Sequence, residues 1–415
     1  MGRSALFFGS ILVLFPSEAF AIDVCQAVGV CDFTNIDAAL ESVSTNGSAT
    51  IDVLDAGVYT EKVEPSSRTG MTVVITTSTG ASISGAVGDQ VKVKGNNDIT
   101  FDGFSLTSTT GNRCALVEDS SILRMHNMTI ENCTKNDEGV GLRVKGTAQA
   151  FIYDSFFINN YQNNGGQIGG GHIYVEAGSL HVERTSFTTG RSASNGGAIA
   201  VNGARTVDLI DVQFIDSNTS ALGAAYYAPG GATTTMTNVT FSRSGFVGPM
   251  AADGGAIYVV GGNLTIDGAT FTDMSASNHG GALYLDSVVA DLDEITITDA
   301  KVTGGALLGA GIYALDTDLT ISGLANNSSF SAPNLTGEDQ ADWGAGIYCN
   351  NGFLDVTDTD FEDLRAGEEG AGIYTTGSCE TTVDNASFNR MDVNRGDGDG
   401  WAIMIAATGV HGISN

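Results

Sequence analysis

The chain has 415 residues, of which 55 are glycine, and its 48 acidic residues against 18 basic ones give a formal net charge of −30. A hydrophobic share of 42% argues against intrinsic disorder, because disordered chains are poor in apolar residues. The acidity argues against a nucleic-acid partner, since binding to phosphates needs clustered Lys and Arg.

Residues 1–21 have the features of a signal peptide. Arg3 precedes an apolar run at residues 5–15, and Ala19-Phe20-Ala21 is the small-x-small pattern that signal peptidases cleave. The run is shorter than the roughly 20 residues that a membrane-spanning helix needs. We therefore expect residues 1–21 to be removed and the mature chain to have no transmembrane helix. The predicted location is secreted or at the cell surface, on a bacterial outer membrane or in the extracellular space.

Residues 22–48 are predicted to form an N-terminal cap. Residues 36–43 carry apolar side chains at helical spacing, behind two candidate capping residues, Thr34 and Asn35. A short amphipathic helix here would cover the open end of the structure that follows.

All six cysteines lie in the predicted mature chain, and an even number in an exported protein favours disulfides. No two CxxC motifs are present to form a zinc site, so no metal is predicted. Six cysteines allow 15 pairings. Nearness in the sequence favours Cys25–Cys31, Cys114–Cys133 and Cys349–Cys379.

Short β-branched segments separated by turn residues follow the cap. The candidate strands are residues 50–54, 73–75, 91–93, 99–101, 122–123 and 128–130.

A glycine-rich motif then recurs clearly between residues 150 and 410. Its copies are residues 170–174, 196–199, 254–258, 280–284, 309–313, 344–348 and 370–374, with a degenerate copy at 223–226. A phenylalanine or a substitute follows each copy: Phe187, Phe214, Phe241, Phe271, Ile297, Phe330, Phe361 and Phe388. The shortest period is 26 residues and occurs three times, from Ile173 to Ile199, from Ile257 to Leu283 and from Ile347 to Ile373.

One copy shows how a coil is built. Residues 257–260, 264–266 and 270–272 alternate as short strands between glycine turns. Ile257, Val259, Leu264, Ile266 and Phe271 are expected to point inward, and Ala256 and Tyr258 outward. Because one unit cannot bury its own apolar face, units must stack. We predict an all-β fold over residues 49–415, a right-handed single-stranded parallel β-helix of roughly 13 coils with a short N-terminal capping helix.

The repeats resemble those of a known group of proteins. Gly-Gly-Ala-Ile motifs alternating with Phe-x-x-Asn-like motifs, such as residues 157–160, are similar to the repeats of chlamydial polymorphic outer membrane proteins and related bacterial β-helix passengers. Residues 36–40 and 51–59 are similar to the first coils of pectin-lyase-like right-handed β-helices. The resemblance implies a surface β-helix, although no segment here corresponds to that family's C-terminal membrane barrel. Residues 401–405 restart a coil that is not finished, so either the chain is a piece of a longer protein or another chain covers this end, and we favour the first.

Two sets of residues are candidates for binding. The first is a row of tyrosines at equivalent positions, Tyr258, Tyr284, Tyr313, Tyr348 and Tyr374, expected on one outer face. Such a row suits contact with flat sugar faces or a partner protein, and stacking for stability alone is the alternative. The second is the edge where the longest insertions fall, carrying Asp339, Asp342, Trp343 and Trp401. Insertions on one edge of a solenoid often mark its binding side, and neutral loop growth is the alternative.

No catalytic residue is predicted. Single Asp residues such as Asp216, Asp273 and Asp363 follow the phenylalanines, and His126, His172, His181, His279 and His411 are scattered over different coils. No cofactor is predicted, and Ca²⁺ at Asp397 and Asp399 is left open although an EF-type loop is not completed.

The favoured hypothesis is a non-catalytic, exported binding scaffold of adhesin or passenger type. Its expected partner is a protein or glycan on a host or neighbouring cell. The alternatives are a polysaccharide lyase or glycoside hydrolase of the pectin-lyase-like fold, and a structural stalk without a ligand.

Overall fold

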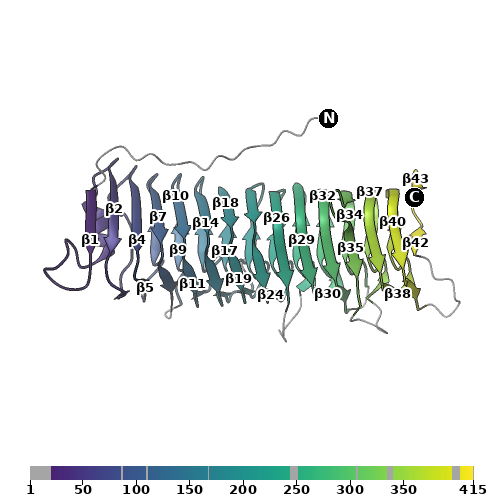
Figure 1. Cartoon of the computed structure of the whole chain (residues 1–415), viewed down its shortest axis with the longest axis horizontal. Helices are drawn as coiled ribbons and strands as arrows, with labels where there is room; N and C mark the ends of the chain where they lie inside the picture. Colours follow the sequence, from purple (N-terminus) through teal and green to yellow (C-terminus); the bar gives the residue numbers. More distant parts are fainter. Residues whose placement is uncertain are drawn as a thin grey trace.

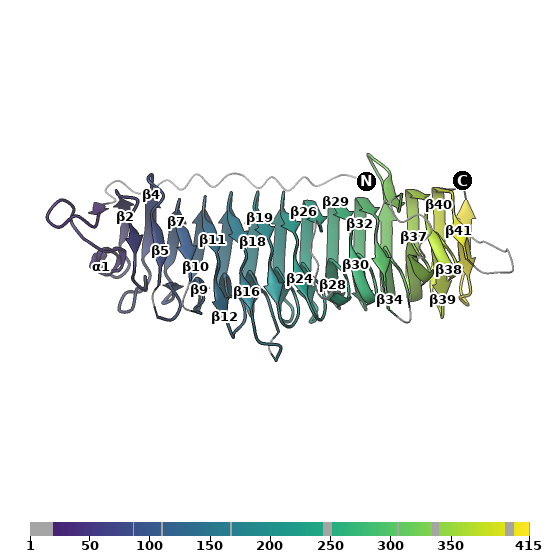
Figure 2. The ribbon, with the colours of Figure 1, turned by 90° about the horizontal axis from the view of Figure 1, so that it is seen from below.

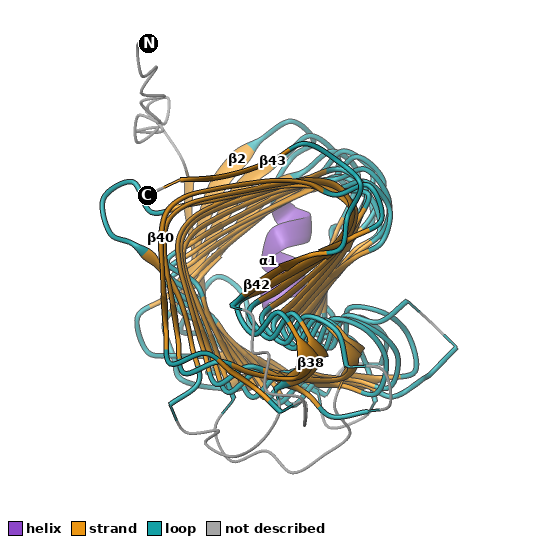
Figure 3. Ribbon diagram, turned by 90° about the vertical axis from the view of Figure 1, so that its right-hand side faces the viewer, coloured by secondary structure: helices purple, strands orange, loops and turns teal. Residues whose placement is uncertain are grey.

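The structure is a computed structural model that describes residues 20–414, apart from residues 86, 109–110, 167, 244–250, 305–306, 334–339 and 395–401. Over these residues the chain is a long parallel β-solenoid of about 14 turns with one short helix near the N-terminus (Figures 1 and 2). The predicted fold class is confirmed, with about one turn more than expected. Viewed from the C-terminal end, the coils wind counter-clockwise toward the viewer, which is the right-handed sense (Figure 3).

Each coil contributes strands to three faces. The first, which we call the long face, contains β1 (Phe20–Val24), β2 (Ser48–Val53), β4 (Thr72–Thr77), β7 (Asp98–Asp102), β10 (Ile122–His126), β14 (Gln149–Tyr153), β18 (Ser179–Glu183), β22 (Thr206–Ile210) and β43 (His411–Ser414). It also takes the first halves of β26 (Thr233–Ser242), β29 (Asn263–Thr272), β32 (Val289–Thr298) and β40 (Glu380–Asn389), the second half of β34 (Ile312–Ser322) and the middle of β37 (Ile347–Glu362).

The phenylalanine face contains β3 (Val58–Tyr59), β5 (Ser82–Ser84), β8 (Ser105–Thr107), β11 (Thr129–Glu131), β15 (Phe156–Ile158), β19 (Ser186–Thr188), β23 (Gln213–Ile215), β35 (Ser328–Ser331) and the later parts of β26, β29, β32, β37 and β40. The tyrosine face contains β6 (Val91–Val93), β9 (Ala115–Val117), β13 (Leu142–Val144), β17 (Ile173–Val175), β21 (Ile199–Val201), β25 (Tyr226–Ala228), β28 (Ile257–Val260), β31 (Leu283–Asp286), β39 (Ile373–Thr376), β42 (Ile403–Ile405) and the starts of β34 and β37.

Short outer strands, which the sequence did not predict, lie between the phenylalanine and tyrosine faces. They are β12 (Thr134–Lys135), β16 (Tyr161–Gln162), β20 (Arg191–Ser192) and β24 (Asn218–Thr219), then β27 (Ala251–Asp253), β30 (Ser275–His279) and β33 (Lys301–Val302), and finally β36 (Ala341–Trp343), β38 (Arg365–Glu369) and β41 (Asp392–Val393). The candidate strands between residues 50 and 130 are all confirmed, as β2, β4, β6, β7, β10 and β11.

The coil that starts at Ile257 shows where the expectation was right and where it was wrong. Ile257, Val259, Leu264, Ile266 and Phe271 are all buried, as predicted. The two strands expected at 264–266 and 270–272 instead form one strand, β29, which bends at Gly268 where φ is +73°. Ala256 was expected to point outward but is 1% exposed and belongs to the core. The strict alternation fails there because the chain is still leaving the glycine turn, so two successive residues face inward.

The glycine pair of the repeat has two separate causes. Gly254 adopts φ +65°, a left-handed conformation that side chains other than Gly disfavour. Gly255 is needed for space, because a Cβ there would overlap the carbonyl oxygen of Gly281 on the next coil. Stacked coils therefore approach more closely at this motif than larger residues allow.

Phenylalanines fill the core in line along the solenoid. Phe187, Phe214, Phe241 and Phe271 stack with ring centroids 5.1, 4.9 and 4.7 Å apart. Ile297 interrupts the line, which resumes at Phe330 and Phe361 with centroids 4.9 Å apart. The recurring Phe of the sequence repeat is therefore a core position.

The N-terminal end is closed by the predicted helix, α1 (Ile36–Ser42), which lies across the bore (Figure 3). Asn35 is the N-cap, and its Oδ1 accepts a hydrogen bond from the Ala38 amide at 2.7 Å. The Glu61 carboxylate accepts two more, from the amides of Ile36 and Asp37 at 2.8 Å each. Ile36, Ala39 and Leu40 are buried. The helix thus covers apolar side chains that the first coil would otherwise expose.

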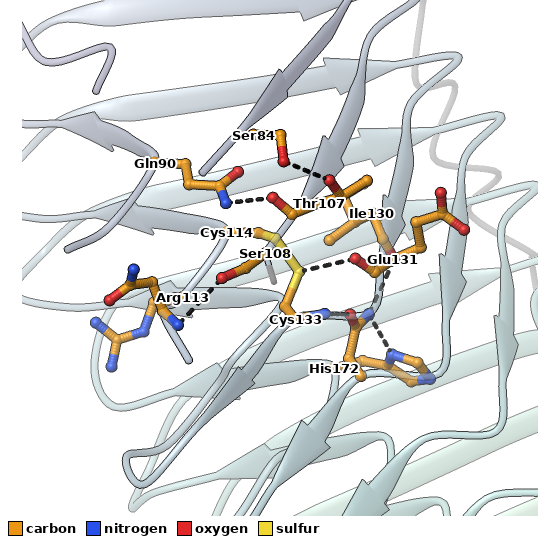
Figure 4. Close-up of a disulfide and its surroundings, with 12 residues drawn as sticks. Ser84, Gln90, Thr107, Ser108, Arg113, Cys114, Ile130, Glu131, Cys133 and His172 are labelled. Carbon is orange, nitrogen blue, oxygen red and sulfur yellow. Dashed lines mark hydrogen bonds between the residues drawn. A yellow bond between two sulfur atoms is a disulfide. The ribbon is translucent and has the colours of Figure 1, made fainter. Parts of the chain in front are cut away.

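The three predicted disulfides are confirmed, Cys25–Cys31, Cys114–Cys133 and Cys349–Cys379. Figure 4 shows Cys114–Cys133, which joins β9 to the turn before β12 and lies near the buried His172. Disulfides of this number are typical of proteins that fold outside the cytoplasm. The predicted signal peptide lies outside the described residues except for Phe20 and Ala21, which begin β1. In the part of the chain that is described, no helix has the length and apolar character needed to cross a membrane.

Candidate functional site

The predicted tyrosines lie in one row on the tyrosine face. Tyr258, Tyr284, Tyr313, Tyr348 and Tyr374 pair with one another in register on successive coils. Their neighbours in the same strands, such as Ile257 and Val259, point into the core, so the tyrosine side chains point outward. The structure extends the row to Tyr227, which pairs with Tyr258. Tyr226, the residue next to it, takes the aliphatic position instead and is fully buried.

The rings of this tyrosine row stack face to face. Centroids are 5.5, 4.6, 4.9, 5.3 and 5.5 Å apart in turn from Tyr227 to Tyr374. Because each ring is covered by its neighbours, little of the row reaches the surface: Tyr227, Tyr313 and Tyr348 are buried, and Tyr258, Tyr284 and Tyr374 are half-buried. A sugar face packs best against an open ring, which this row does not offer. Burial raises the pKa of Tyr258 and of Tyr313 to about 12, so both hydroxyls stay protonated at neutral pH. The row is an uncharged aromatic stack of which Tyr258, Tyr284 and Tyr374 are the partly exposed members.

A second row, which we call the flanking row, runs beside the tyrosines. It consists of the residues just before the glycine motifs, which pair coil to coil: Leu222, Asp253, His279, Leu308 and Trp343. The His279 ring stacks on Tyr313 with centroids 4.8 Å apart. Trp343 is half-buried in β36, and the neighbouring Asp342 accepts a hydrogen bond from the Leu307 amide at 3.3 Å. The structure therefore places the predicted Trp343 and Asp342 on the same side as the predicted tyrosines.

Two acid–base groups of the flanking row lie close together. Asp253 Oδ1 accepts a hydrogen bond from the His279 amide at 3.1 Å. Burial raises the pKa of Asp253, and burial lowers the pKa of His279. Both shifts favour the uncharged form, in keeping with a site among aromatic rings. His279 was one of the histidines the sequence left scattered, and only the register of β27 and β30 reveals its neighbours.

Two predicted binding residues, Asp339 and Trp401, lie outside the described residues, as do Asp397 and Asp399. Their contribution to a site stays a prediction.

A charged network occupies the N-terminal end of the tyrosine row, and sequence reasoning missed it. Arg143 pairs with Tyr174 in register and lies over its ring, with Cζ 5.5 Å from the centroid. Its guanidinium contacts Asp137 at 3.1 Å, Glu138 at 3.5 Å and Glu176 at 2.6 Å. Burial and the adjoining Asp137 raise the pKa of Glu138. Burial alone would raise the pKa of Asp137 as well, but its hydrogen bond with Glu138 and the nearby arginines hold it well below its usual range.

The Asp residues that follow the phenylalanines have a conformational role. Asp216, Asp273 and Asp363 adopt φ of +53°, +58° and +56° at equivalent corners of their coils. Asp and Asn tolerate this left-handed region better than most residues. Within the described residues, no group of three or more His, Cys, Asp or Glu side chains is arranged to hold a metal ion.

Comparison with known proteins gives a distant structural likeness. No family model and no curated protein sequence matches this chain. Among solved structures, Escherichia coli YbhC is similar, with 15% sequence identity, a TM-score of 0.32, and coverage of 69% of this chain and 74% of that one. The resemblance of its repeats to those of polymorphic outer membrane proteins stays an expectation.

Proposed function

We propose that the protein is an exported, non-catalytic binding scaffold of adhesin or passenger type. Its binding surface is the side formed by the tyrosine row and the flanking row, and its partner is a protein or glycan on another cell. The observation that carries the proposal is that these two rows run in register along the same side, with the His279 ring stacked on Tyr313.

The chemistry of this side suits a repetitive partner. Tyrosines recur once per coil, and a polymer lying along the solenoid would meet the half-buried Tyr258, Tyr284 and Tyr374 in turn. Trp343 adds a large aromatic side chain to the flanking row, and tryptophan and tyrosine are the residues that most often dominate binding energy at interfaces.

Export is supported by the sequence and by the disulfides. The N-terminal pattern at residues 1–21 is that of a signal peptide, and three disulfides are typical of an oxidising compartment. A net charge of −30 keeps such a rod soluble and separate from its copies.

Substitution of Trp343 tests the proposal. The purified protein is applied to a printed panel of cell-surface glycans and glycoproteins, and Trp343→Ala is compared with Phe353→Ala, an exposed aromatic on the long face. We expect the wild type to be retained, Trp343→Ala to bind at least about tenfold more weakly, and Phe353→Ala to bind normally. If Trp343→Ala binds the panel as tightly as the wild type, the proposed surface is wrong. If the wild type binds no member of the panel, the stalk hypothesis takes its place.

A specific observation favours polysaccharide cleavage as a second candidate. The carboxylates of Asp137 and Glu138 lie 3.1 and 3.5 Å from the Arg143 guanidinium, which places two acidic groups and a cation together, and their pKa values are shifted in opposite directions as in an acid and base pair. Release of reducing or unsaturated ends from pectic or neutral polysaccharides, abolished by Glu138→Gln, would support this candidate. Cleavage that persists in Glu138→Gln would assign the activity to other residues.

A further inference from the structure

The long face carries a cluster of rings that the rest of that face lacks. Most outward positions of its strands are Thr, Ser or Asp. Thr100, Thr235, Thr265 and Thr320 occupy the same row as Phe151, and Thr237 shares a row with Tyr153. On β10, β14 and β18 these positions hold Arg124, His126, Phe151, Tyr153 and His181, which together we call the ring patch.

The five side chains of the ring patch contact one another across three coils. Arg124 lies over Phe151, with Cζ 4.9 Å from the ring centroid. His126 stacks on Tyr153 at 4.7 Å, and His181 lies against both Tyr153 and Phe151 at 5.5 and 6.0 Å. The His181 ring is tilted by 48° to Phe151 and by 52° to Tyr153, so the patch is less closed than the stacked tyrosine row.

Carboxylates pair with the basic groups at the margin of the patch. His181 Nδ1 lies 2.8 Å from Asp208 Oδ2, and its Nε2 lies 3.7 Å from Glu183. Arg124 is paired with Asp98 at 3.0 Å. These side chains are between 22% and 35% exposed, so donors, acceptors and ring edges all reach the surface.

Stability alone does not account for the patch. Threonine suits the solvated face of a sheet, and the same rows are filled by threonine on several other coils. A local departure from the pattern of a repeat is where function is expected. The patch is separate from the candidate site above, because the long face and the tyrosine face lie on different sides of the bore (Figure 3).

We propose that the ring patch binds an uncharged polysaccharide. Sugars combine hydroxyls, which the carboxylates, guanidinium and imidazoles can bind, with apolar C–H surfaces, which pack on aromatic side chains. A polyanion is disfavoured because Arg124 is already paired with Asp98, two further carboxylates lie beside His181, and the chain carries a net charge of −30. The chemistry therefore selects a neutral sugar polymer lying across β10, β14 and β18.

The test replaces the rings by the residue that the same rows carry elsewhere. Phe151→Thr combined with Tyr153→Thr removes both rings, and the matched control is Thr235→Ala combined with Thr237→Ala, in the same two rows on β26. Affinity electrophoresis and calorimetry use soluble β-glucan, α-mannan, xylan and galactan, with polygalacturonate as the charged comparison. Circular dichroism confirms that each variant is folded.

We expect at least one neutral polymer to bind, and the double ring variant to bind it about tenfold more weakly. The threonine control and Phe353→Ala, which removes a lone exposed aromatic from the same face, should bind it normally, which assigns the binding to the ring patch. Failure to bind any of the four neutral polymers overturns the proposal. So does binding that survives removal of both rings, or equal binding of polygalacturonate.

Discussion

Arg113 is a charged side chain that the fold buries almost completely, being only 3% exposed. Its guanidinium contacts Asp89 at 3.1 Å and Asp137, and donates to the carbonyl oxygens of Glu138 and Gly139. A buried cation without such partners would be strongly unfavourable. Arg113 therefore anchors the segment that leads into β13, next to the Cys114–Cys133 disulfide (Figure 4).

Replacement of Arg113 by Met should destabilise the protein by about 2 kcal/mol at pH 7, because Asp89 and Asp137 lose their buried partner. In the wild type the lowered pKa of Asp137 contributes stability above pH ~4, and this is lost as the pH falls further. The difference between wild type and Arg113→Met should therefore narrow below pH ~4. Urea unfolding followed by circular dichroism at pH 7 and at lower pH measures both effects.

Arg184→Met is the control for this prediction. Arg184 also forms an ion pair, with Asp154, but the two side chains are 47% and 43% exposed. Exposed pairs contribute roughly 0–1 kcal/mol. Equal destabilisation by the two substitutions would contradict the role assigned to the buried arginine.

The residues of the ring patch show that the contacts between side chains on different coils could not be predicted from the sequence. His126 and His181 are far apart in the sequence and lie on different coils, as predicted, yet both contact Tyr153. Their proximity depends on the register of β10, β14 and β18, which is set by the lengths of irregular turns. The tyrosines could be predicted to share a row because the glycine motif beside each of them marks the register directly.

At the level of strands, the tyrosine row stacks one ring from each coil on the next. A tyrosine inside the row therefore contacts two other tyrosine rings, whereas one at the end contacts a single ring. Tyr284 contacts Tyr258 and Tyr313, whereas at the C-terminal end Tyr374 stacks on Tyr348. Aromatic pairs contribute about 0.5–1.5 kcal/mol each. We therefore expect Tyr284→Thr to lower the free energy of unfolding about twice as much as Tyr374→Thr, measured by urea denaturation. Equal losses would indicate that the stack itself contributes nothing.

The period of the repeat was enough to predict the coil and its core. Phe187, Phe214 and Phe271 recur at the spacing of the glycine motif, and all three stack in the interior. The short outer strands could not be predicted, because β12 or β33 has only two residues and no alternation to recognise. Ala256 was wrongly placed outside because period-two alternation does not continue through a glycine turn.

For the molecule as a whole, each coil contacts its neighbours along the axis, so stability should be transmitted from coil to coil rather than shared by one global core. The helix α1 closes the N-terminal end, and each disulfide joins segments of the same or adjacent coils. Cys349 and Cys379, for example, have a sequence separation of 30, close to one repeat. A local change is then expected to have local consequences.

Removal of the Cys349–Cys379 disulfide tests whether a local change destabilises only the neighbouring coils. Cys349→Ser combined with Cys379→Ser should destabilise the surrounding coils by about 3 kcal/mol, since the loop that the disulfide closes regains its freedom in the unfolded chain. Hydrogen exchange should then accelerate in β37, β39 and β40 while β7, β10 and β14 keep the wild-type rate. Cys114→Ser combined with Cys133→Ser should give the reverse pattern. Faster exchange along the entire solenoid in either variant would instead show that the coils unfold as a single cooperative unit.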